Sequence, residues 1–127
     1  MLELFAAVAA CTVLAGLAIF QGALIGGASL GRLAWGGQHD VLPTGLKVGS
    51  AVSIILYALF GYAAVAKAAL VPPLVSESFT SVSIWVLTAY FALGVIMNGI
   101  SRSKPERLIM TPIALVLAAL YLILAVG

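Results

Sequence analysis

Residues 4–30 read LFAAVAACTVLAGLAIFQGALIGGASL and contain no charged side chain. An α-helix rises about 1.5 Å per residue, so about 20 apolar residues cross the hydrocarbon core of a bilayer, which is about 30 Å thick. This run is therefore long enough to span a membrane. Three further apolar runs follow it, and together they predict membrane spans at about residues 4–30, 46–70, 82–100 and 108–126.

The composition agrees with a membrane protein. The 127 residues are 64% hydrophobic and 8% charged, whereas a soluble domain is about 45–50% apolar and about 25% charged. Such a chain has too few polar side chains to cover a water-exposed surface. The connections between the spans are short, and short connections join antiparallel neighbours. The sequence thus predicts one all-α domain, a membrane-spanning up-down-up-down four-helix bundle.

Several function classes find no support in the sequence. The single cysteine, Cys11, excludes a disulfide within the chain and a Cys/His metal cluster, and the thinly spread basic residues do not indicate nucleic-acid binding. His39 and Asp40 are adjacent, but adjacency does not place a carboxylate against an imidazole, so we expect a solvated loop there. An enzyme acting on lipid through Glu106, His39 or Asp40 has no residue spacing in its favour. We therefore expect no catalytic residue, metal or cofactor.

The positions of lysine and arginine predict the orientation in the membrane. Cytoplasmic loops carry an excess of basic residues, and in a four-span chain the first and third connections share one side. The opposite side holds only Lys67. The sequence therefore predicts a multi-pass protein of the cell membrane with the first and third connections in the cytoplasm and both termini outside. The basic residues of the predicted cytoplasmic side are Arg32, Lys47, Arg102, Lys104 and Arg107.

Polar side chains within the spans are expected to gather at the mouth of the bundle that the first and third connections share. Polar groups are costly in hydrocarbon and usually face other helices. Two interpretations are open: a pocket for a head group or small solute, or hydrogen bonds that hold the helices together. We favour the second, because no carboxylate is expected inside a span. The candidate residues are Gln21, Ser50, Ser53, Tyr57, Asn98 and Ser101, with Arg102 and Glu106 just beyond.

Two overlapping G-x-x-x-G spacings, Gly22/Gly26 and Gly27/Gly31, lie in the first predicted span. Glycine lets two helices approach closely. The helix-packing face that these residues predict serves either packing within the monomer or a homodimer.

The third connection is short and basic. Ser103 and Glu106 have the spacing of a capping box at the start of the fourth span, with Pro105 near the first helical position. The basic side chains of this connection are expected to meet anionic lipid, each contributing about 1 kcal/mol near the surface. They act either as a general anchor or as a specific anionic-lipid site built from Arg102, Lys104 and Arg107.

The run NGISRSKPER at residues 98–107, followed by Thr111-Pro112 and an Ala/Leu-rich last span, resembles a pattern in small four-span bacterial membrane proteins, mainly from actinobacteria. The pieces Trp35-Gly36-Gly37 and Val41-Leu42-Pro43 fit the same resemblance. It implies this fold and a membrane location, but no activity.

The leading functional hypothesis is a non-enzymatic binding or accessory module that packs with itself, with a membrane protein partner or with lipid. The alternative is a small transporter or channel subunit that uses the polar mouth. Transport requires a polar path along the bundle axis, and the outer halves of the first and fourth spans are almost wholly apolar.

Overall fold

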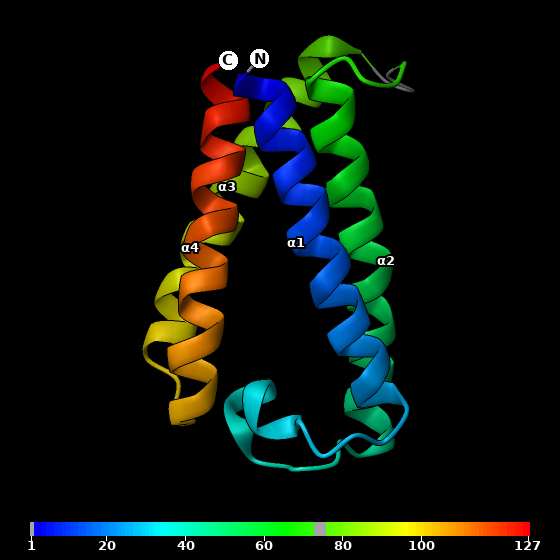
Figure 1. Ribbon diagram of the computed structural model, residues 1–127, viewed down its shortest axis with the longest axis vertical. Coiled ribbons are helices and arrows are strands. Elements are labelled where there is room, and N and C mark those ends of the chain that lie inside the picture. Colours follow the sequence, from blue (N-terminus) through cyan, green and yellow to red (C-terminus); the bar gives the residue numbers. More distant parts are fainter. Residues whose placement is uncertain (1, 73–75) are drawn as a thin grey trace.

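The computed structural model describes residues 2–72 and 76–127, and the described residues contain four long helices and no strand. All four helices are long and apolar enough to cross a membrane. They alternate in direction, and both termini lie at the end of the bundle opposite the first and third connections (Figure 1). The predicted all-α, four-helix architecture is thereby confirmed. The helices are α1 (Leu2–Ile25), α2 (Thr44–Lys67), α3 (Glu77–Gly99) and α4 (Lys104–Val126).

Helix α1 ends at Ile25, earlier than the predicted boundary at residue 30. Gly27 has a positive φ of 91°, the Ala28 amide donates to Ala23 O at 3.0 Å, and the Gly27 amide donates to Leu24 O at 3.1 Å. This pair of bonds is a Schellman motif, which glycine favours because it enters the left-handed region without strain. The glycines at this point stop the helix, and they do not extend a packing face.

Helices α3 and α4 begin earlier than predicted because serine residues cap them. The Ser76 hydroxyl accepts from the Phe79 amide at 3.2 Å, and Glu77 stands in the first turn of α3. The Ser103 hydroxyl likewise accepts from the Glu106 amide at 3.4 Å at the start of α4, so the predicted cap is confirmed. Residues 73–75 of the predicted second connection, Pro73 among them, lie outside the described part of the chain.

The tightly packed core lies toward the end that carries the termini. Small side chains bring α1 close to its neighbours there, since Ala6, Ala7 and Ala10 have no exposed surface. Tyr121 crosses from α4 to α2, where its hydroxyl donates to Phe60 O at 2.6 Å. Large apolar residues from α1, α3 and α4 complete this core, namely Leu14, Ile84, Leu87, Phe91, Leu117, Leu120 and Leu124.

The outer surface of the bundle is apolar, as a lipid-facing surface requires. Large hydrophobic side chains are exposed along each helix, including Ile19, Ile55, Val86 and Leu115. Exposed apolar area on this scale is not found on a monomeric soluble protein. The chain is therefore a small multi-pass membrane protein.

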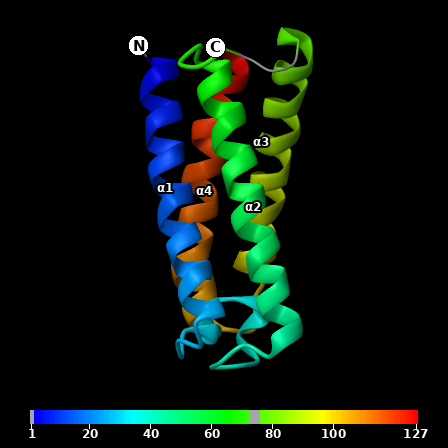
Figure 2. The same cartoon turned by 90° about the vertical axis from the view of Figure 1, so that its right-hand side faces the viewer.

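The first connection folds across the end of the bundle (Figures 1 and 2). It contains two short 3₁₀ turns, Gly31–Leu33 and Trp35–Gly37. Backbone contacts fix its shape: the Gly31 amide donates to Asp40 O at 2.8 Å, and the Ser103 hydroxyl donates to Arg32 O. His39 and Asp40 are exposed, in keeping with the solvated loop that the sequence predicts at these two residues.

Candidate binding site

A cavity of about 340 Å³ lies between the four helices, on the side of the core that faces the first connection. The helix pairs α1·α2 and α3·α4 separate toward this end, and the first connection lies beneath the space between them (Figure 1). Most of its lining is apolar or aromatic. The lining residues with large apolar side chains are Leu17, Phe20, Leu33, Trp35, Tyr90, Phe91, Leu93, Met97, Met110, Ile113 and Leu117.

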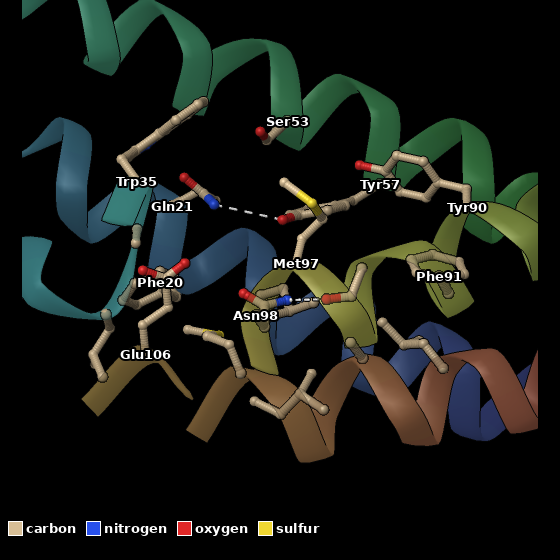
Figure 3. A pocket seen from close by; sticks show the side chains of 18 of the residues that line it. Phe20, Gln21, Trp35, Ser53, Tyr57, Tyr90, Phe91, Met97, Asn98 and Glu106 are labelled. Atoms are coloured by element: carbon tan, nitrogen blue, oxygen red, sulfur yellow. Dashed lines mark hydrogen bonds between the residues drawn. The ribbon is translucent and has the colours of Figure 1, made fainter. Parts of the chain in front are cut away.

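Polar groups gather in the part of the cavity near the first connection. Gln21 of α1, Ser53 and Tyr57 of α2, Asn98 of α3 and Glu106 of α4 all line it. Their side chains surround one space (Figure 3). The Gln21 amide nitrogen donates to the Tyr57 hydroxyl at 3.5 Å, a long hydrogen bond. The cavity is thus amphipathic, with an apolar body and a polar end.

Glu106 is the carboxylic acid of this lining. It is 9% exposed, and its Oε2 atom accepts from the Gly36 amide at 3.0 Å and from the Ser101 hydroxyl at 3.1 Å. It stands in the first turn of α4, at the positive end of the helix dipole. No hydrogen bond from the described residues reaches its Oε1 atom, which remains available to the cavity.

Gln21 and Asn98 also have unused hydrogen-bonding capacity. Gln21 is 8% exposed, and its Oε1 atom has no hydrogen-bond partner among the described residues. Asn98 uses its amide nitrogen to donate to Gly94 O at 2.8 Å, which leaves its carbonyl oxygen as an acceptor. A buried polar group without a partner costs about 1–3 kcal/mol. The cavity therefore carries polar groups that a bound molecule can satisfy.

The wall of the cavity formed by α3 is also part of the lipid-facing surface. Tyr90, Leu93 and Met97 line the cavity, and each is more than half exposed on the outside of the bundle. The opposite side is closed by the first connection, where the Trp35 indole packs against α2. A Cβ atom at Gly49 would lie 2.9 Å from that ring.

The structure brings together four of the six predicted polar residues. Gln21, Ser53, Tyr57 and Asn98 line one cavity. Ser101 does not line the cavity, but its hydroxyl donates a hydrogen bond to the Glu106 carboxylate. Ser50 is fully buried, its hydroxyl has no hydrogen-bond partner among the described residues, and it does not line the cavity.

The expectation that no carboxylate would be buried near this cluster is wrong. Glu106 was expected just beyond the polar residues at the mouth of the bundle, in a capping box in which its side chain bonds back to the Ser103 amide. Instead that amide donates to the Ser101 hydroxyl at 3.2 Å, and the Glu106 carboxylate turns toward the first connection. The Glu106 carboxylate accepts a hydrogen bond from the Gly36 amide, which is 70 residues away in the sequence. The spacing of residues near Glu106 therefore could not reveal that Glu106 is buried.

The predicted glycine face is not continuous. Gly27 and Gly31 lie beyond the end of α1, so their spacing does not describe a helix surface. Gly22 is exposed, and a Cβ atom there would meet nothing within 4 Å; it therefore does not pack against another helix of the chain. Gly26 is likewise exposed and meets only the backbone of its own helix.

The predicted anionic-lipid residues remain on the surface. Arg102, Lys104 and Arg107 are exposed, and the Arg107 guanidinium donates to Ser101 O at 3.1 Å. These residues lie on the same end of the bundle as the cavity, but none of them lines it.

Sequence reasoning missed the contribution of the first connection. Leu33, Ala34 and Trp35 form part of the lining, whereas the residues predicted at this mouth did not include them. One signal was present in the sequence, namely its glycines: Gly31 lies close to the backbone of His39 and Asp40, and Gly37 lies close to Ser103 at the start of α4.

The fold and the cavity define a small four-span membrane protein with an amphipathic cavity between its helices. Searches of protein families, of curated proteins and of solved structures give no match to this chain. The chemistry of the cavity is what indicates a function for this chain.

Proposed function

We propose that this protein is a non-enzymatic binding module of the membrane, which holds a lipid-like amphipathic molecule in the cavity between its four helices. The observation that carries the proposal is the cavity itself: about 340 Å³, lined mainly by apolar side chains, with polar groups at one end. Ligand pockets commonly have this character and this range of volume. A molecule with a hydrocarbon body and a small polar head matches both parts of the lining.

The transport alternative has less support. A transported polar solute needs a path past the core, but the cavity ends at Phe91 and Leu117. Both are buried in an apolar cluster with Leu14, Leu120 and Tyr121. Polar solutes would have to cross this cluster, whereas a lipid-like molecule needs only to reach the cavity.

Filling the cavity should reduce ligand retention. Ser53 lines it, and its hydroxyl donates to Gly49 O at 3.0 Å within α2. In Ser53→Leu the larger side chain occupies part of the cavity, so we expect at least about a tenfold loss of retained amphiphile. The measurement is extraction in a mild detergent, followed by mass spectrometry of the intact protein and of the released small molecules.

Ser83→Leu is the matched control for this experiment. Ser83 is also partly exposed, and its hydroxyl also donates to a carbonyl one turn earlier, Phe79 O at 2.8 Å. It lies on α3 outside the cavity. Equal retention by the two variants, or no retained molecule in the wild-type protein, would contradict the proposal.

The proposed orientation places the cavity at the cytoplasmic side of the membrane. It follows from the excess of basic residues on the first and third connections. We expect a reporter fused to the C-terminus to be outside, and a single cysteine introduced at Gln38, in a Cys11→Ala background, to be labelled only from the cytoplasm. Gln38 is exposed, and Cys11 is the single cysteine of the sequence, so the Cys11→Ala background carries no other thiol. A cytoplasmic C-terminus would reverse the orientation.

A further inference from the structure

If the protein binds an amphipathic molecule as proposed above, the charge of the cavity lining indicates which head group that molecule has. Glu106 contributes an acidic group, and none of the lining residues is lysine, arginine or histidine. An anionic head group in this space would face a carboxylate without a compensating cation. Like charges in a poorly solvated site repel strongly, so the lining disfavours phosphate and carboxylate heads.

The free hydrogen-bonding atoms point in the same direction. The Glu106 Oε1 atom and the Asn98 carbonyl oxygen are acceptors without a partner among the described residues. Gln21 lines the same space (Figure 3) and adds a third unpartnered acceptor, Oε1, which is itself buried. Rotation about the last torsion of Gln21 can turn either end of its amide toward the cavity.

We propose that the cavity selects amphipathic molecules whose head group donates hydrogen bonds and carries no negative charge, with a primary amine preferred over a hydroxyl. An ammonium group supplies three donors and no acceptor, which complements the acceptors of this lining. Its bond to Glu106 is charge-assisted and hence stronger than the bond of a neutral alcohol. The hydrocarbon chain of the ligand lies among the aromatic and aliphatic residues farther from the first connection.

Trp35 provides a direct readout of occupancy. The chain has two tryptophans, and Trp35 lines the cavity whereas Trp85 does not. The full-length Trp85→Phe protein in discs of zwitterionic lipid therefore keeps one tryptophan, Trp35, which lines the cavity and is 43% exposed. The probes are a dodecyl amine, a dodecyl alcohol and a dodecanoate, each brominated in mid-chain to quench a tryptophan in contact with it. Trp35→Phe, which retains Trp85 on the exposed surface of α3, measures non-specific partition of each probe into the disc.

We expect saturable quenching of Trp35 by the amine at about tenfold lower concentration than by the carboxylate, with the alcohol between them. In Glu106→Gln the amide oxygen can still accept from the Gly36 amide and the Ser101 hydroxyl. Amine affinity should nevertheless fall about tenfold, while alcohol affinity changes little. Asp40→Asn is the control, because it also removes an acidic group at this end but lies outside the cavity.

The possible outcomes separate this inference from the function on which it depends. Saturable quenching with the carboxylate as tight as the amine overturns the head-group selectivity and leaves a binding module in place. The same holds if Asp40→Asn lowers amine affinity as much as Glu106→Gln does. The absence of saturable quenching by all three probes overturns the binding function itself. The comparison of the amine, alcohol and carboxylate probes uses a protein with an unchanged Glu106. It therefore tests the inference even if Glu106→Gln fails to fold.

A second arm identifies the source of the ligand. An amine-headed lipid that accompanies the protein from the cell membrane, identified by mass spectrometry, indicates a membrane lipid. A protein that arrives empty and binds the added amine indicates a hydrophobic amine from outside the lipid pool. If the protein retains an anionic lipid, and a brominated form of that lipid quenches Trp35 saturably, the proposed head-group preference is contradicted.

Discussion

Replacing Tyr121 with alanine should lower the free energy of unfolding by about 3 kcal/mol. The Tyr121 side chain has no exposed surface, its ring centroid lies 5.0 Å from that of Phe91, and its hydroxyl reaches Phe60 O. Truncation leaves a cavity where α2, α3 and α4 meet. We expect the lower part of the range known for large core truncations, because lipid tails solvate the separated helices and only packing is lost.

Two companion variants separate the contributions of Tyr121. Tyr121→Phe keeps the ring and removes the hydroxyl, and it should cost about 1 kcal/mol. Leu122→Ala truncates the next residue of α4, which is 45% exposed to lipid, and should stay within about 0.5 kcal/mol of the wild type. Reversible unfolding in mixed micelles, followed by circular dichroism, measures all three. An effect of Leu122→Ala as large as that of Tyr121→Ala would contradict the proposed position of the core.

Replacing Gly31 with alanine should release the first connection from the end of the bundle, at a cost of about 3 kcal/mol. The added Cβ atom would overlap His39 O and would lie 2.7 Å from Asp40 O. Both obstacles are backbone atoms, which no side-chain rotation can move aside. We expect Trp35 to lose its contact with α2, which a red shift of its fluorescence reports, and faster amide exchange throughout residues 28–43.

Gly22→Ala is the matched control, because a Cβ atom at Gly22 meets nothing within 4 Å. In the interior of α1 this change removes the flexibility of glycine and should stabilise the helix by about 0.5–1 kcal/mol. If Gly31→Ala left both the fluorescence and the exchange of this segment unchanged, the first connection would not be packed as described.

The architecture was predictable from sequence because one physical requirement dominates it. A chain with this little polar surface must place long apolar helices in lipid, and the number and direction of the spans follow. The ends of the helices were predicted less well. The first boundary depended on whether Gly26 and Gly27 continue a helix or stop it, and residue spacing alone does not distinguish the two.

The polar end of the cavity was predictable in part, for a related reason. Gln21, Ser53, Tyr57 and Asn98 are polar residues in apolar spans, and their depth along alternating helices brings them to one end. Glu106 was predicted only as a neighbour of this cluster, and neither its burial nor the place of Trp35 in the lining could be assigned in this way. Both reach the cavity through the path of the first connection, which depends on contacts with Gly36, Gly49 and Ser103 that are distant along the chain.

The shared wall between the cavity and the lipid-facing side of α3 affects how binding must be measured. A molecule that passes between Tyr90, Leu93 and Met97 comes from the bilayer, so its effective concentration is set by its partition from water. Each added methylene favours that partition by about 0.8 kcal/mol. Lengthening the tail of a binder by one carbon should therefore raise its apparent potency in the aqueous phase about fourfold, even where the new carbon touches no atom of the protein.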